Sequence, residues 1–231
     1  MKKNVIKKRI LNFNLIFDQS GLLFIEQTKT IVISDIHFGK GTSINKKGGY
    51  VPPYEIIETI KKLKKKIDYY SPLRIISLGD SFHDKFSISD MNRSDLSEIN
   101  KITNKVEFIW INGNHDQNLI AKDRIGGVFM EYLKEDNFVY KHIRTDNYKK
   151  NEFEFTGHFH PKFSLKINNS SYFYKCFILT ENFCILPSFG TYTGGLDIKN
   201  KIFKKIINGN ADIIVLGKNH MIQKHINNDS N

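Results

Sequence analysis

Cysteine, arginine and long apolar segments are scarce in this chain of 231 residues, and each shortage excludes a class of protein. The only cysteines, Cys176 and Cys184, lack the spacing of a thiolate metal site, so we expect two buried and reduced thiols. No apolar run approaches the roughly 18 residues that a transmembrane helix needs. The N-terminus is charged but lacks the apolar stretch of a signal peptide. We therefore expect a cytoplasmic protein with no membrane partner.

Arginine is rare although the chain is basic. Lysine and arginine together number 35 against 24 acidic residues, which gives a formal net charge of +11. A basic surface attracts polyanions, but arginine, with its planar fork, would be the more telling ligand for phosphate. An AT-rich genome encodes Lys, Asn and Ile frequently in any protein, so their abundance here does not by itself indicate a function. No helix-turn-helix or zinc-finger motif is present. The charge favours an anionic substrate without indicating recognition of DNA or RNA.

Internal repeats, low-complexity segments and Pro-, Gly- or Ser-rich linkers are also absent. The chain is 40% hydrophobic and long enough to bury a sizeable core. We predict a single domain over residues 1–226 and a disordered tail over residues 227–231.

The sequence does contain an alternation of strands and helices. Apolar residues from Ile56 to Ile67 recur with a helical period, which predicts a helix over residues 54–69, and a second helix is expected over 92–103. This order is typical of a layered α/β domain. Short apolar runs predict strands, the first two forming a hairpin, over residues 11–17, 22–26, 30–34, 74–78, 106–111, 127–132, 138–142, 152–156, 163–167, 172–178, 182–186, 212–216 and 220–225.

Polar residues cluster where predicted strands end. Ligands of α/β sheets bind beyond the carboxyl ends of the strands, and residues two apart in an extended chain project to the same side. Carboxylate, imidazole and amide oxygen together form a ligand set that suits manganese, iron or zinc. The clusters are Asp35 with His37, Asp80, Asn114 with His115, and His158 with His160.

The order of these clusters resembles the calcineurin-like metallophosphoesterases over roughly residues 30–195. His142 is the candidate for the single histidine of that family's signature because it lies between the third and last motifs, although no motif frames it. The signature D-x-H, GD, GNH[DE], His, GHxH stands here as Asp35-Ile36-His37, Gly79-Asp80, Gly113-Asn114-His115-Asp116, His142 and Gly157-His158-Phe159-His160.

The resemblance implies a fold and a metal site. The fold is a four-layer α-β-β-α metallophosphoesterase sandwich of two mixed sheets flanked by helices, with the motif loops at one end. Two divalent ions are implied, and we expect manganese, with iron or zinc as alternatives. The first ion would be held by Asp35, His37 and His160. The second would be held by Asn114, His142 and His158, with Asp80 bridging both.

A narrower resemblance points to the bacterial PdeM subgroup, described as a ligase-associated DNA damage response endonuclease or phosphodiesterase. It implies a phosphate-ester substrate, possible nucleic-acid cleavage, and association with a DNA ligase or helicase in DNA repair. It is carried by the segments Gly79–Asp84, Pro52-Pro53-Tyr54, Gly126-Gly127 and Leu186–Leu196.

The expected reaction is hydrolysis of a phosphate diester. Two cations, partly neutralised by Asp35 and Asp80, leave a positive site in which a metal-bridged hydroxide attacks phosphorus. His115 is expected to be the general acid, with Asp116 orienting its imidazole. The expected substrate-binding residues are His83, Tyr192 and Gly194.

Two alternatives stay open from the sequence. A phosphomonoesterase or small-nucleotide hydrolase would use the same metals, and an open groove for both ester arms would distinguish a diesterase from it. A non-catalytic scaffold on a degenerate fold would lack ligands or the acid, and none of these is missing.

Overall fold

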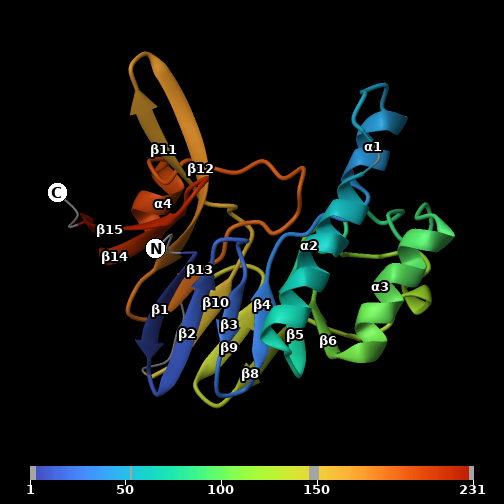
Figure 1. The fold of residues 1–231 in the computed structure, drawn as a ribbon, viewed down its shortest axis with the longest axis horizontal. Helices are drawn as coiled ribbons and strands as arrows, with labels where there is room; N and C mark the ends of the chain where they lie inside the picture. The colour runs from blue at the N-terminus through green and yellow to red at the C-terminus, as the bar shows by residue number, and fades with distance from the viewer. Residues whose placement is uncertain (1–3, 53, 146–150, 229–231) are drawn as a thin grey trace.

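The strands assemble into two mixed β-sheets that pack face to face (Figure 1). The computed structural model describes residues 4–52, 54–145 and 151–228. In the first sheet the strands follow chain order: β1 (Val5–Ile10), β2 (Phe13–Asp18), β3 (Leu23–Ile25), β4 (Thr30–Ile33), β5 (Arg74–Leu78), β6 (Glu107–Ile111) and β7 (Val128–Met130). The expected hairpin is β2 paired antiparallel with β3.

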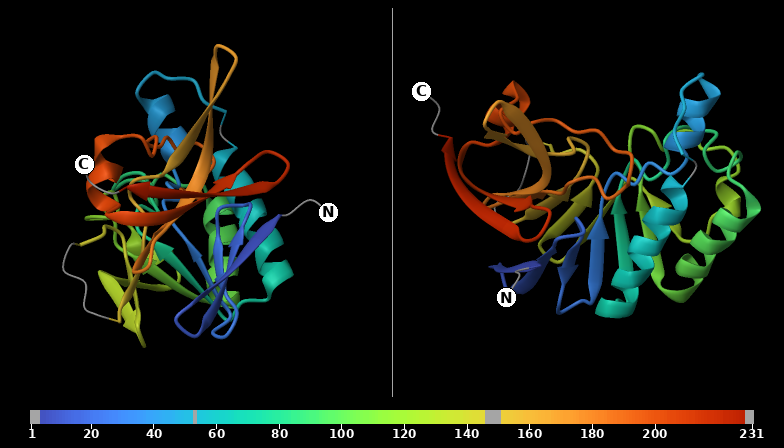
Figure 2. Two further views of the ribbon diagram at one scale, coloured as in Figure 1. Left: turned by 90° about the vertical axis from the view of Figure 1, so that its left-hand side faces the viewer. Right: turned by 45° about the horizontal axis from the view of Figure 1, so that its top comes forward.

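In the second sheet the strand order departs from the chain order. The neighbours are β15 (Met221–Asn228), β14 (Gly209–Leu216), β12 (Ser170–Leu179), β13 (Phe183–Ile185), β10 (Phe153–Thr156), β9 (Phe138–Lys141) and β8 (Tyr132–Glu135). A further strand, β11 (Lys162–Ile167), pairs with β12 alone. The resulting hairpin rises beyond the sheet in all three ribbon views (Figure 2).

Each sheet contains a parallel part, and these parts place the functional loops. Strands β4, β5, β6 and β7 are parallel neighbours in the first sheet. Strands β9, β10 and β13 are parallel neighbours in the second. The carboxyl ends of both sets lie at the same end of the sandwich, so the loops that follow them meet there.

Helices cover the outer faces of both sheets. On the first sheet lie α2 (Glu55–Tyr70) and α3 (Arg93–Lys105), whose apolar sides belong to one buried cluster with that sheet. On the second sheet lies the short helix α4 (Lys201–Ile206), which buries Phe203. The two sheets bury a third cluster between them, in which the rings of Phe17 and Phe177 meet edge to face at 5.1 Å. The expected four-layer sandwich is confirmed.

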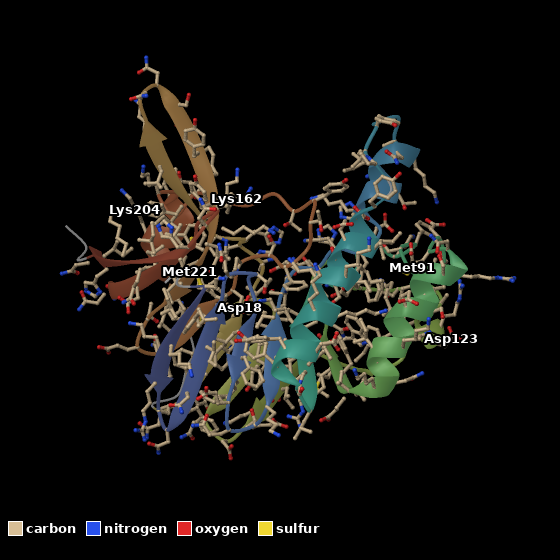
Figure 3. All side chains as sticks on the ribbon, viewed as in Figure 1. Asp18, Met91, Asp123, Lys162, Lys204 and Met221 are labelled. Atoms are coloured by element: carbon tan, nitrogen blue, oxygen red, sulfur yellow. The ribbon has the colours of Figure 1, made fainter. Side chains whose placement is uncertain are left out.

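Polar anchoring also fixes helix α2 on the first sheet. The carboxylate of Asp18, at the end of β2, is buried (Figure 3). It accepts hydrogen bonds from Lys66 Nζ at 2.8 Å and from the Tyr70 hydroxyl at 2.7 Å. Because a buried acceptor without partners is costly, this pair ties the last turns of α2 to β2.

Several sequence-based boundaries need correction. The strand expected over residues 127–132 is two strands, because β7 ends the first sheet and β8 starts the edge of the second. The tail expected from residue 227 is wrong for residues 227 and 228, which pair with β14. Residues 229–231 and Pro53 lie outside the described residues. Strand β1 and the helices α1 (Lys40–Lys46), α4 and the short η1 (Lys122–Arg124) were not anticipated.

Two expectations from composition can be compared with the structure. Cys176 and Cys184 are free and buried, as expected. Within the described ranges, no helix combines the length and the apolar character needed to span a bilayer.

Candidate metal centre

The candidate ligands stand in loops with an unusual backbone. Five of them have φ in the left-handed region: Asp35 (51°), His37 (53°), Asp80 (48°), His158 (70°) and His160 (45°). The extended geometry expected for the D-x-H and H-x-H pairs is therefore wrong, and each pair converges through two left-handed residues flanking a third. Such a conformation costs of order 1–3 kcal/mol at a non-glycine residue and persists where the surroundings fix it, which is typical of functional sites.

Hydrogen bonds between the first two motif loops supply that fixation. The backbone N–H of Asp35 donates to Gly79 O at 3.1 Å, and that of His37 donates to Asp80 O at 2.9 Å. The loop after β4 is thus paired with the loop after β5. From the second sheet, Gly157 approaches so closely that a Cβ there would collide with the hydroxyl of Ser34. The left-handed turns are held from both sheets.

The first group of candidate ligands is Asp35, His37 and His160. Their ligand atoms all lie within 4.8 Å of one another. His160 Nε2 is 3.0 Å from Asp35 Oδ1 and 3.3 Å from His37 Nε2. The second carboxylate oxygen of Asp35 accepts from Ser34 Oγ at 2.6 Å and from the His158 N–H at 3.0 Å. Asp35 Oδ2 is therefore held by Ser34 and the His158 N–H, while Oδ1, which the same N–H approaches at 3.2 Å, faces His160.

The second group is Asp80, His142 and His158, again with all ligand atoms within 4.8 Å. Nδ1–H of His142 donates to the Leu78 carbonyl at 2.8 Å, which leaves Nε2 as the coordinating nitrogen. That Nε2 lies 3.3 Å from Asp80 Oδ2 and 3.1 Å from His158 Nδ1. The structure thus brings His142, which no sequence motif frames, into the site.

Asp80 stands between the two groups. Its Oδ1 accepts the His115 N–H at 2.8 Å, and its Oδ2 lies 4.0 Å from His37 Nε2 as well as near His142. Asn114 precedes His115 in the same loop and is exposed, lining a cavity of about 940 Å³ together with His142. The bridging role of Asp80 and the ligand role of Asn114 stay predictions that this placement accommodates.

The electrostatics of the site fit divalent cations. Burial lowers the pKa of His37 to about 3, so its imidazole is neutral and available as a ligand. Burial raises the pKa of Asp35, but hydrogen bonding and charge from His160 outweigh it and hold the carboxyl below its usual value. Burial also raises the pKa of Asp80, but the hydrogen bond and the charge of His142 outweigh it and favour the ionised carboxylate. Buried carboxylates together with imidazoles form a donor set suited to manganese, iron or zinc.

The pKa of His142 depends on the same competition between burial and nearby charge. Burial lowers its pKa, but the hydrogen bond with Asp80 and the charges of Asp35 and Asp80 raise it to about 9. The two acidic side chains therefore attract a positive charge to Nε2 of His142, the same atom that the Leu78 carbonyl leaves free. A metal cation at this position would replace that proton.

The structure corrects the expected partnership of His115 and Asp116. The Asp116 carboxylate is buried and accepts the backbone N–H groups of Phe82 (2.9 Å), Gly113 (2.9 Å) and Ser81 (3.2 Å). It therefore binds the two motif loops together, while burial raises its pKa to about 6. The imidazole of His115 is held instead by the carbonyl of His83, 2.6 Å from Nδ1. The sequence offered no signal for a backbone partner.

The structure places the three expected substrate-binding residues differently. The ring of His83 stacks on that of His115 at 5.4 Å, and their nitrogens form with His37 a third convergent group among the described residues. The hydroxyl of Tyr192 donates to Pro52 O at 3.3 Å, which directs it to the segment before α2. Gly194 has open space around it, whereas the following Gly195 lies against the His160 carbonyl. The close backbone approach is thus made by Gly195, which the sequence did not single out.

A comparison with family profiles matches residues 28–218 to the calcineurin-like phosphoesterases. The chain belongs to this family. This calcineurin-like phosphoesterase is accordingly a metal-dependent hydrolase of phosphate esters, and the Asp and His groups described above are able to hold metal ions of the kind that the family binds.

Solved structures are similar to this calcineurin-like phosphoesterase to different degrees, and the first one below supports the fold. The Pseudomonas putida nuclease MPE matches with a TM-score of 0.74 and 20% identity over 95% of this chain and 100% of that chain. The E. coli phosphoesterase Yfce matches with a TM-score of 0.40 and 11% identity over 85% of this chain and 97% of that chain. The first match is consistent with the PdeM-like subgroup expected from the sequence. A comparison with curated proteins found no significant match.

Proposed function

We propose that this calcineurin-like phosphoesterase is a dinuclear phosphodiesterase that cleaves nucleic-acid diesters. The observation that carries the proposal is the position of Asp80, whose Oδ2 faces His142 of one ligand group at 3.3 Å and His37 of the other at 4.0 Å. A carboxylate shared in this way suits a pair of cations held close together. When bound, two divalent cations would activate a water molecule and neutralise charge on the phosphoryl group.

His115 supplies the proton for the leaving group in this proposal. Its Nδ1–H donates to the His83 carbonyl at 2.6 Å, so Nε2 is the nitrogen left to face a substrate. The ring stands 5.1 Å from the ring of His37, beside the first ligand group. A carbonyl acceptor on Nδ1 also fixes the orientation of the ring, so that Nε2 can act as the donor of a general acid.

The choice of a diester over a monoester rests on space. The cavity of about 940 Å³ is lined by Asn114 and His142 of the second ligand group and extends to Lys122 and Tyr132. It offers room for an ester arm beyond the metals, whereas a monoester has one arm fewer to place. The structural match with a nuclease supports nucleic acid as the diester, and the net charge of +11 favours an anionic substrate in general.

The proposal is tested by hydrolysis of bis-p-nitrophenyl phosphate against p-nitrophenyl phosphate, with Mn²⁺ or with EDTA. We expect metal-dependent cleavage that favours the diester and is lost in Asp80→Ala. Asp68→Ala is the matched control, because this exposed carboxylate on α2 lies only near Lys105. A preference for the monoester would instead indicate a phosphatase. Failure to turn over either ester with Mn²⁺, Fe²⁺ or Zn²⁺ would exclude the enzymatic proposal.

Manganese as the native ion and DNA repair as the setting extend this proposal. Metal analysis of the protein purified without chelator tests the first, with manganese expected in excess over zinc and iron. Single-stranded and duplex oligonucleotides test the second, with cleavage expected to require the same residues as the small diester. Co-purification with a DNA ligase or helicase would support the proposed repair partners. Hydrolysis of free nucleotides without cleavage of oligonucleotides would contradict the repair setting.

A further inference from the structure

The segment that follows β13 lies directly on the first motif loop. It crosses from the second sheet toward α2 (Figure 1). The N–H of Phe189 donates to Ser34 O at 2.7 Å, and the N–H of Gly190 donates to Asp35 O at 3.3 Å. A Cβ on Gly190 would collide with the Ile36 carbonyl, so the two backbones are in contact without a side chain between them. The position of Asp35 is therefore coupled to the position of this segment.

Lys175, from β12, holds the segment on one side. Its Nζ donates to Ser188 O at 2.7 Å, Gly190 O at 2.8 Å and Thr193 Oγ1 at 3.0 Å. These three acceptors match the three N–H donors of an ammonium group. Thr193 Oγ1 also lies 2.6 Å from Ser188 Oγ and donates to Gly190 O at 2.9 Å. Lys175 is thus the centre of a compact hydrogen-bonded cluster.

Lys62, from α2, holds the segment on the other side. Its Nζ donates to the carbonyl of Phe189 and, at 3.4 Å, to that of Ser20, and it lies 3.6 Å over the Phe189 ring. The three successive carbonyls of residues 188–190 therefore alternate between two lysines. Burial lowers the pKa of Lys62 to about 7 and that of Lys175 to about 8, and the two charges repel each other. Placing two ammonium groups here is unfavourable by itself, so the carbonyls must compensate it.

We propose that Lys175 is a positioning residue for the first metal-binding group, which it orders by clamping residues 188–190 together with Lys62. The inference rests on the proposed metal-dependent function, but it concerns metal affinity and can be tested without turnover. The clamp fixes the backbone at Ser34 and Asp35 and so sets the direction of Asp35 Oδ1, which lies 3.0 Å from His160 Nε2. It acts on the ligands through the main chain, and its charge also acts on Asp35.

The first test is Mn²⁺ binding to metal-free protein by calorimetry, comparing wild type with Lys175→Ala and Lys175→Arg. Loss of a residue that orders metal ligands typically costs about 10–100-fold in affinity, and we expect Lys175→Ala to weaken the tighter Mn²⁺ site by that factor. Lys175→Arg should recover only part of the loss, because a planar fork does not match three converging acceptors. Unchanged Mn²⁺ affinity in Lys175→Ala would overturn the inference.

Chemical rescue and a matched control separate positioning from general stability. Ethylammonium or propylammonium ions should restore Mn²⁺ affinity to Lys175→Ala by occupying the vacated donor position, and tetramethylammonium, which has no N–H, should not. Lys66→Met is the control, since it removes a half-buried lysine that binds Asp18 and does not touch the segment. We expect it to lower the thermal midpoint without weakening Mn²⁺ binding. Equal loss of Mn²⁺ affinity in both variants, without rescue, would assign Lys175 a structural role alone.

Two further outcomes keep this inference distinct from the proposed function. Wild type that binds Mn²⁺ but hydrolyses no ester would refute the phosphodiesterase and leave the calorimetric test of Lys175 intact. Active wild type with an unchanged Lys175→Ala variant would refute the clamp and leave the phosphodiesterase intact.

Discussion

The two ligand groups of this calcineurin-like phosphoesterase differ in how the fold encloses them. In the first, Asp35 is fully buried, one of its oxygens is held by Ser34 and His158, and residues 188–190 cover its backbone. In the second, His142 and Asn114 line the large cavity. A cation in the first group would be set by the folded chain, whereas a cation in the second would be reached from the side on which substrate can enter.

Asp80→Ala is the largest expected perturbation, because it removes the one side chain that faces both groups. Stabilisation of transition-state charge by bound metal is worth several kcal/mol, so we expect diester hydrolysis to fall by roughly 10³-fold or more. Both Mn²⁺ binding events should weaken in calorimetry. A variant that retained two tight sites would show that the groups are independent and that Asp80 does not bridge them.

His115→Gln tests whether the leaving oxygen departs beside the first ligand group, since the His115 ring lies beside the ring of His37. General acid catalysis contributes about 10²–10⁴-fold, and we expect a loss in this range for a dinucleotide, whose sugar oxygen needs a proton. The loss should be much smaller for bis-p-nitrophenyl phosphate, because p-nitrophenolate leaves without one.

The control for this prediction is His225→Gln, since His225 lies on β15 and contacts Asp212 at 3.1 Å, away from the motif loops. Rates for both substrates should match wild type. Equal losses for the two substrates in His115→Gln would contradict an acid role and point to a contribution to binding or folding.

Separate ligand removals sharpen the contrast between enclosed and open sites. We expect His142→Ala to abolish the weaker of two Mn²⁺ binding events and His160→Ala to abolish the tighter one. Each should reduce activity by at least about tenfold, the lower end of the effect seen when only outer contacts of a metal site are removed. Calorimetry gives the stoichiometry and both affinities. Identical binding curves for the two variants would remove the asymmetry inferred from the cavity beside His142 and Asn114.

The sequence predicted the residues that belong to motifs better than those that no motif frames. Asp80 directly follows a glycine and His160 belongs to a motif that begins with one, so their convergence was expected correctly. His142 has no such frame, and the structure places it through a hydrogen bond to Leu78 O. Lys62 and Lys175 bind backbone carbonyls, which every residue carries, and no local pattern can reveal such partners.

Fold prediction failed where tertiary contact overrides local pattern. The left-handed φ values of Asp35 and His37 belong to non-glycine residues, so propensity argues against them, and tertiary contacts such as the pairing with the loop of Asp80 maintain them. The run over residues 127–132 is apolar except for Glu131, and a single charged residue does not mark the point where the chain passes between sheets. Local periodicity indicates a strand without specifying which sheet it joins.

Asp18→Asn is expected to have the smallest effect on the site, because the carboxylate anchors α2 to β2 away from both ligand groups. Burial raises the pKa of Asp18, but Lys66, Ser20 and Tyr70 outweigh it and lower it below its model-peptide value of 3.8. The stabilisation by a group with a lowered pKa is present above the unfolded pKa and is lost as pH falls through the folded one. Urea unfolding at pH 7 should therefore show the variant less stable by about 1–3 kcal/mol, and the gap should shrink below pH 4. A gap independent of pH would mean that packing, rather than charge, holds the helix, while Mn²⁺ affinity at pH 7 should stay at the wild-type value if scaffold and site are separable.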